Sequence, residues 1–217
     1  MSSKVIVIVG ATGLVGSAVI DLLKYQPSYE VRCLVRSPYS LNDSDQCPNI
    51  TYHVVSFLDL DDCKHLFDGV THVICAVGTT IKKAKTREQF QLVDHYIPKA
   101  VARIAKESGA QSFQLISSIG ANPKSSSFYL QVKGMVEDIV IREQYERLII
   151  YRPSLLAGKR TEFRFFEQLM LMVCQMFLWV IPIRYRPTKV SNFASRIVED
   201  IAMEKNGVHI VESSVIH

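Results

Sequence analysis

Val5-Ile-Val-Ile-Val-Gly-Ala-Thr-Gly-Leu-Val-Gly16 is the stretch that decides the fold of this chain. Five consecutive β-branched apolar residues run directly into three glycines, Gly10, Gly13 and Gly16. A continuous apolar strand is typical of a parallel sheet that is covered on both faces. Beyond the glycines, apolar residues recur with helical spacing to about Tyr25. The pattern predicts a strand, a tight turn and a helix.

This order of elements is the context in which a glycine triplet indicates a dinucleotide site. The pyrophosphate rests on backbone N–H groups at the helix N-terminus. The first glycine makes the turn, the second lets the backbone approach the phosphates, and the third lets the helix pack on the sheet. The spacing is Gly-x-x-Gly-x-x-Gly, so a turn that binds nothing stays an alternative. The expected cofactor contacts here are Gly10, Thr12, Gly13, Leu14, Val15 and Gly16.

Composition limits the class of protein. The 217 residues predict a single domain, residues 1–217, and 48% of them are hydrophobic. Lys and Arg number 25 against 21 Asp and Glu, and neither a long basic run nor a nucleic-acid motif occurs, which argues against nucleic acid as a ligand. Five scattered cysteines favour a reducing compartment and predict no metal site. The longest apolar stretch is shorter than the ~20 residues of a membrane span, so we expect a cytoplasmic protein.

A second strand is expected over Glu30 to Arg36. In dinucleotide folds this strand end meets the adenosine ribose, where an acidic residue favours NAD and an arginine accommodates the 2′-phosphate of NADP. Arg36 and Ser37 stand there, with no acidic residue at the strand end. The pattern favours NADP(H) and leaves NAD(H) possible. A solvated arginine is the alternative.

Further strands are expected over 50–55, 71–78, 112–116, 147–151 and 208–211, with helices over 86–108, 128–145 and 191–204 between them. Strands that alternate with helices predict an α/β fold, a doubly wound parallel sheet of the Rossmann type. Asp59 follows the third strand, where it would either bind the adenine amino group or cap a short helix. Gly78 and Thr79 end the fourth strand at the same edge.

Three residues form a candidate catalytic set. Tyr129 and Lys133 are four apart and share a helical face, and Ser118 lies at the carboxyl end of the fifth strand. A phenol with a pKa of about 10 is a poor acid–base group until a neighbouring ammonium lowers that pKa. A serine hydroxyl would hold a carbonyl oxygen against the tyrosine. The set suits proton transfer to a carbonyl while a hydride reaches its carbon.

Several stretches resemble the atypical, NmrA-like branch of the short-chain dehydrogenase/reductases, and most of all the Tat-interacting oxidoreductase group. The resemblance runs from the start of the chain to about Arg160 and implies a Rossmann fold, NADP(H) and a Ser/Tyr/Lys site. By matching position Lys133 would bind the nicotinamide ribose, and Ala76, Val77 and Pro153 would contact the cofactor. One departure is Asp94, which stands where larger members often have an asparagine. The matching stretches are 9–16, 34–36, 76–80, 115–121, 129–134 and 151–158.

The part of the chain after the sixth strand should decide the substrate. Residues 155–190 are expected to cover the cleft, with an apolar helix over 162–180. A dimer surface or a peripheral membrane contact are the alternatives for this helix, and the protein would be a monomer or a homodimer. The leading hypothesis is an NADP(H)-dependent carbonyl oxidoreductase for an unidentified small molecule. A cofactor-sensing regulator with a protein partner, and an epimerase or dehydratase with a retained nicotinamide cofactor, are the other two.

Overall fold

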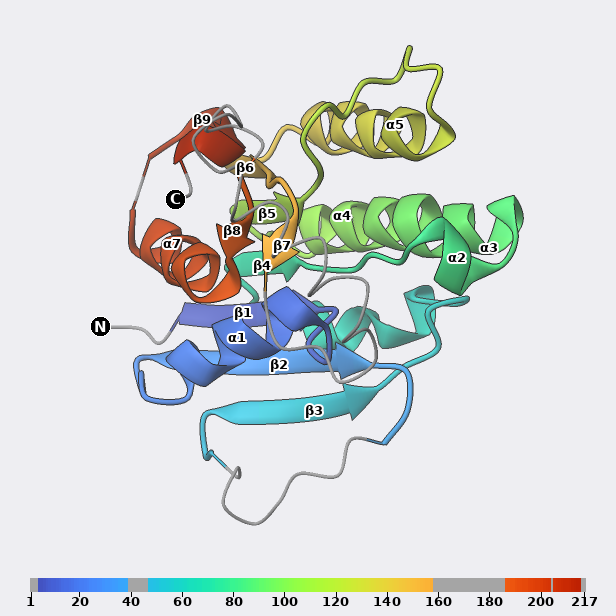
Figure 1. Ribbon diagram of the computed structural model, residues 1–217. Helices are drawn as coiled ribbons and strands as arrows, with labels where there is room; N and C mark the ends of the chain where they lie inside the picture. The colour runs from blue at the N-terminus through green and yellow to red at the C-terminus, as the bar shows by residue number, and fades with distance from the viewer. Residues whose placement is uncertain (1–3, 39–46, 158–185, 204, 216–217) are drawn as a thin grey trace.

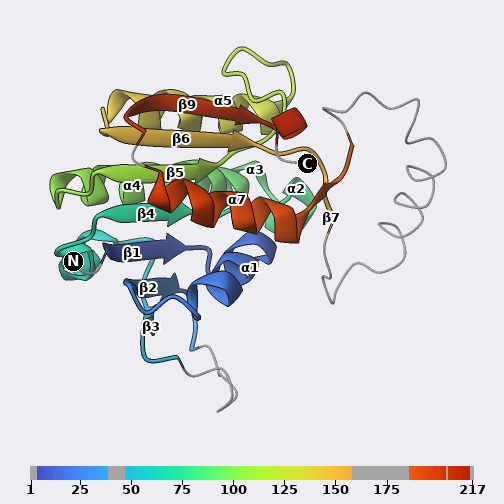
Figure 2. The ribbon, with the colours of Figure 1, turned by 90° about the vertical axis from the view of Figure 1, so that its left-hand side faces the viewer.

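The computed structural model describes residues 4–38, 47–157, 186–203 and 205–215. In them, seven parallel strands form one sheet in the order β3-β2-β1-β4-β5-β6-β9, which Figure 2 shows as a stack. This is the doubly wound Rossmann arrangement that the sequence predicts. The strands are β1 Lys4–Val9, β2 Tyr29–Val35, β3 Ile50–Val54, β4 His72–Cys75, β5 Ser112–Ile116, β6 Arg147–Arg152 and β9 Gly207–Glu212.

Helices cover both faces of the sheet (Figure 1). On one face α1 (Leu14–Leu23) packs beside α7 (Val190–Ala202). On the other lie α4 (Ile97–Glu107), α5 (Phe128–Arg142) and the 3₁₀ helix η2 (Asp61–Phe67). Side chains of β1 alternate between the two cores, with Ile6 and Ile8 in one and Val7 and Val9 in the other. Burial on both faces is why this strand is apolar at every position.

The strand order reverses at β1. Its neighbours are β2 on one side and β4 on the other, so the chain leaves the centre of the sheet in both directions. Ligands of doubly wound sheets bind in the crevice outside the carboxyl ends of the strands at this reversal. The glycine turn after β1 and the residues after β4 therefore share the edge at which a site is expected.

The helical segment expected over 86–108 contains a wide turn. It consists of α3 (Arg87–Gln91), a π turn η3 (Leu92–Tyr96) and α4, and a short α2 (Ile81–Ala84) precedes it. Pro98 lacks the N–H that would bind the Asp94 carbonyl, and the Ile97 N–H instead donates to the Leu92 carbonyl. Gly109 ends the segment at φ +88°, the left-handed conformation expected of a glycine after a helix.

Little of the predicted cover region can be described. The two-residue strands β7 (Leu156–Ala157) and β8 (Thr188–Lys189) pair in parallel. The expected helix over 162–180 lies outside the described residues, as does most of 155–190. The last expected strand is β9, which pairs with β6. The short η5 (Ser213–Val215) follows it.

Candidate active site

The glycine turn brings the ends of β1 and β4 into contact. Gly10 has a φ of +90°, and a Cβ there would lie 2.6 Å from the carbonyl carbon of Ala76 and 2.8 Å from the Val77 nitrogen. A Cβ on Gly16 would lie 2.2 Å from the Gly10 carbonyl oxygen. Both positions therefore require glycine. The turn joins two of the stretches that the sequence assigns to the cofactor.

The N-terminus of α1 suits an anion. Gly13 is its N-cap, no side chain caps it, and its first turn holds no acidic residue. The Gly13 N–H bonds to the Gly10 carbonyl, while Leu14 and Val15 begin the helix. Thr12 is exposed beside them. Uncapped N–H groups at a helix N-terminus form a phosphate-binding site, so these residues fit the pyrophosphate of a dinucleotide.

The ends of β2 and β3 lie where the sequence predicts the adenosine end of the cofactor. Arg36 and Ser37 follow β2 and are exposed, and Arg36 forms no ion pair with any described residue. Asp59, also exposed, lines a pocket of about 380 Å³ between η2 and the start of α4. Leu58, Leu92 and Tyr96 are among its other lining residues. The lining also includes charged side chains, Asp61, Lys99 and Arg103, so the pocket is partly polar. An exposed carboxylate such as Asp59 can accept a hydrogen bond from an amino group, and an exposed guanidinium fits a phosphate.

Lys133 and Asp94 form a buried ion pair behind this edge. Asp94 Oδ1 lies 2.8 Å from Lys133 Nζ, and the two side chains are 0% and 9% exposed. The Thr79 N–H donates to Asp94 Oδ2 over 2.7 Å. Gly78 lies against the pair, since a Cβ there would be 3.5 Å from Asp94 Oδ1. The structure thus brings three predicted site residues, Gly78, Thr79 and Lys133, to one point.

Tyr129 lies close enough to this pair to interact electrostatically with Lys133. Burial alone would lower the pKa of Lys133, but the charges of Asp94 and Tyr129 raise it above its ordinary value. Lys133 is therefore an ammonium at neutral pH. The Tyr129 ring is half-buried and packs 5.7 Å from the ring of Phe90. This arrangement provides the charged neighbour that the candidate acid–base tyrosine requires.

Ser118 lies at the carboxyl end of β5, half-buried. The next residue, Ile119, donates its N–H to the carbonyl of the buried Pro153 over 3.0 Å. Farther along the same loop, the Asn122 N–H donates to the Leu130 carbonyl of α5. A Cβ on Gly134 would lie 2.3 Å from the Asn122 carbonyl carbon, so glycine lets this loop pack on α5. Backbone contacts therefore join the loop of Ser118 to the segments of Pro153 and Tyr129.

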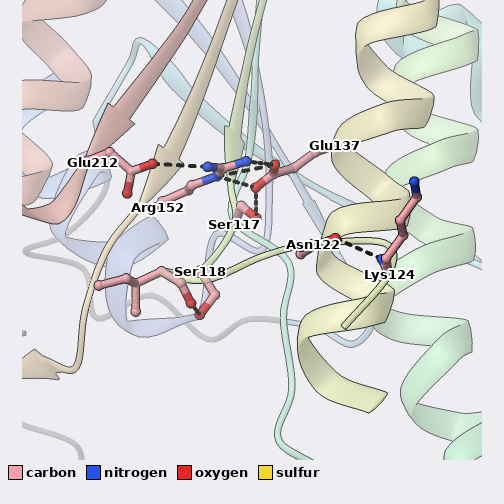
Figure 3. A network of polar contacts seen from close by, with 8 residues as sticks. Ser117, Ser118, Asn122, Lys124, Glu137, Arg152 and Glu212 are labelled. Atoms are coloured by element: carbon pink, nitrogen blue, oxygen red, sulfur yellow. Dashed lines mark hydrogen bonds and ion pairs between the residues drawn. The ribbon is translucent and has the colours of Figure 1, made fainter. Parts of the chain in front are cut away.

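A polar network that the sequence analysis did not predict connects the ends of β5, β6 and β9 to α5 (Figure 3). Ser117 donates to Glu137 on α5 over 2.5 Å, and Arg152 on β6 binds Glu137 and Glu212. Glu137 is 3% exposed. Its sequence signal is an acidic residue on the buried face of α5, four residues after Lys133. The network fixes the carboxyl ends of β5 and β6 relative to the middle of α5.

In the residues that the structure describes, the His, Cys, Asp and Glu side chains form no group of three that would hold a metal ion. No helix in this described part of the chain has the length and apolar character needed to cross a membrane.

Sequence comparisons place the chain in a family. Residues 10–169 match the family model described as NAD(P)H-binding. The chain is 34% identical to Protein HTATIP2 of Rattus norvegicus over 165 residues, 76% of this chain and 67% of that protein. It is also 34% identical to Protein FMP52, mitochondrial, of Debaryomyces hansenii, over 70% of this chain and 67% of that protein.

A solved structure shows the same fold. UDP-glucuronic acid 4-epimerase from Bacillus cereus, in complex with NAD, superposes with a TM-score of 0.73 at 14% identity. The match covers 96% of this chain and 77% of the epimerase. Fold, glycine turn and family model agree with the resemblance seen in the sequence. The chain belongs to the NAD(P)H-binding family, as an atypical short-chain dehydrogenase/reductase.

Proposed function

We propose that this protein is an NADP(H)-dependent oxidoreductase that reduces a carbonyl, or oxidises the corresponding alcohol, of a small molecule. The observation that carries the proposal is the placement of Lys133. Its ammonium lies between Tyr129 and the turn of Gly78 and Thr79, and that turn follows the strand end that meets Gly10. An acid–base pair thus adjoins a dinucleotide-binding edge.

The roles of the residues follow from their chemistry. The nicotinamide, when bound, supplies or accepts the hydride. Tyr129 gives a proton to the carbonyl oxygen during reduction and removes it during oxidation. Lys133 stabilises the phenolate that this transfer produces and offers N–H donors to the ribose, while Pro153 lies on the nicotinamide side. The Ser118 hydroxyl donates to the carbonyl oxygen and orients it toward Tyr129.

The preference for NADP(H) over NAD(H) rests on Arg36. Its guanidinium is exposed, and a permanently charged, planar set of donors suits a 2′-phosphate. Ser37 adds a hydroxyl donor beside it. Asp59 would accept the adenine amino group at the rim of its pocket.

An epimerase or dehydratase with a retained cofactor is the second candidate. The likeness of the fold to the NAD-containing epimerase favours it. The two candidates differ in what becomes of the cofactor, because an epimerase regenerates it within each turnover. Purified protein that carries stoichiometric cofactor through gel filtration would support the second candidate.

The experiment that tests the main proposal is a titration with NADPH followed by a panel of aldehydes and ketones. We expect saturable binding and substrate-dependent oxidation of NADPH by at least one carbonyl compound. Binding of NADPH without its oxidation by any compound of the panel would contradict the proposed reductase activity. Absence of binding would also contradict NADPH as the cofactor.

Location and assembly stay predictions. The sequence favours the cytoplasm, whereas the relative from Debaryomyces hansenii carries the word mitochondrial in its name. Fluorescence microscopy of the tagged full-length protein would distinguish the two compartments. Analytical ultracentrifugation would distinguish the monomer from the homodimer.

A further inference from the structure

Asp94 is a buried carboxylate to which the proposed mechanism assigns no role. It lies in the π turn, 1% exposed, on the same face as the apolar residues Phe90, Ile97 and Val101. Apart from the ion pair with Lys133, Oδ1 has no hydrogen-bond donor in the described part of the chain. Its other oxygen holds the Thr79 N–H. A charge in such a position is expensive unless it is paired.

The surroundings of Lys133 make its charge depend on Asp94. The groups that face its ammonium are Asp94 from the π turn, Tyr129 from its own helix and the Cys75 thiol from β4. Asp94 is the carboxylate among them, and burial raises the pKa of the Cys75 thiol to about 12, so the thiol stays neutral. Burial can lower the pKa of a lysine without a counterion by up to about 3–5 units. Asp94 is therefore the group that opposes this lowering.

Asp94 also connects Lys133 to the cofactor edge. One carboxylate oxygen contacts the ammonium and the other fixes the backbone of Thr79. An ammonium has three donors, and the contact with Asp94 uses one of them. The remaining donors are left for the phenol of Tyr129 and for a ribose hydroxyl.

We propose that Asp94 is the positioning residue of this site: it keeps Lys133 protonated and holds it between Tyr129 and the Thr79 turn. This inference rests on the proposed function, because it assumes that Lys133 binds the ribose of NADPH. It predicts that cofactor affinity is independent of pH across the neutral and mildly basic range only while Asp94 is present.

Asp94→Asn tests the proposal because it removes the charge and retains an oxygen for the Thr79 N–H. NADPH is titrated by fluorescence from pH about 7 to about 9.5, above the phosphate pKa of about 6. We expect wild-type affinity to vary little with pH. The affinity of the variant for NADPH should fall about tenfold as pH rises, since a neutral amine makes weaker hydrogen bonds than an ammonium. The double variant Asp94→Asn/Lys133→Met should show no such pH dependence.

The outcomes separate the two proposals. If wild-type protein binds no NADPH, the proposed function fails and this inference fails with it. If wild-type protein binds NADPH and Asp94→Asn has the same flat profile, the inference alone is overturned, because a merely structural role lowers affinity equally at every pH.

A second measurement does not depend on the folding of the Asp94 variant. In wild-type protein with ¹³Cε-labelled lysine, the Lys133 resonance is identified by its loss in Lys133→Met. We expect the Lys133 resonance to titrate at a higher pH than the resonances of the exposed lysines. Titration at a lower pH than theirs would overturn the proposal.

Discussion

Glu137 on α5 binds Arg152 on β6, with Oε2 2.6 Å from Nη2. Glu137 lies one helical turn after Lys133, and Arg152 immediately precedes Pro153. The largest influence on the pKa of Arg152 is its hydrogen bonding to Glu137, which raises that pKa. This ion pair thus fixes the distance between α5, which carries the candidate acid–base residues, and the end of β6, where the nicotinamide is expected.

Arg152→Met should destabilise the protein by about 2–4 kcal/mol, because it leaves the buried carboxylate of Glu137 without its cation. The free energy of unfolding in urea measures the effect. Arg103→Met is the control, since Arg103 pairs with exposed Asp61 and Glu107 and its loss should change stability much less. Equal losses in the two variants would show that the Glu137 pair contributes no more than a surface pair.

Gly16→Ala should abolish NADPH binding and lower the melting temperature, because the added methyl would lie 2.2 Å from the Gly10 oxygen. Gly69→Ala is the control: its φ is +70° but the added methyl meets no atom within 4 Å. That variant should lose about 1 kcal/mol of stability and keep its affinity for NADPH. Normal NADPH binding by Gly16→Ala would contradict the close approach of α1 to the turn.

Arg36→Ala should lower the affinity for NADPH by about 10- to 100-fold and leave the affinity for NADH nearly unchanged. A hydrogen bond to a charged group contributes about 1.5–3 kcal/mol, and the 2′-phosphate is absent from NADH. Calorimetric titration with both cofactors measures the difference. Parallel losses for NADPH and NADH would remove the argument for a 2′-phosphate site.

His72 should make the protein less stable in acid. Its pKa is lowered to about 4, mainly by burial and in smaller part by the positive charges of Lys4 and Arg147. Between pH about 6.5 and 4 the unfolded chain binds a proton that the folded protein rejects, so stability falls by up to about 3 kcal/mol as pH falls. His72→Gln should show a shallower loss in urea unfolding across this range. The same slope in both proteins would exclude His72 as the cause.

The fold was predictable because its signals are local. The apolar run before Gly10 predicts a strand buried on both faces, and Ile6 to Val9 are buried in the structure. A glycine after an apolar helical pattern predicts a helix end, and Gly109 has the positive φ of such an end. Alternation of such strands with helices then leaves the parallel sheet as the expected result.

The site was predictable only in part, because its polar partners are distant in sequence. Asp94 and Lys133 are 39 positions apart, and the visible signal was an acidic residue within an apolar helical stripe. Arg152 and Glu212 are 60 positions apart, and no spacing rule joins them. The roles of Ser118, Tyr129 and Arg36 stay predictions, since they concern ligands.

The central claim is that Tyr129 transfers the proton in an NADPH-dependent reduction. The most direct measurement compares wild-type protein with Tyr129→Phe, following NADPH oxidation with the best carbonyl compound of the panel and NADPH affinity in parallel. We predict that turnover falls by at least about 100-fold, the usual contribution of a general acid, while affinity for NADPH changes less than threefold. Turnover by Tyr129→Phe at the wild-type rate would contradict the claim.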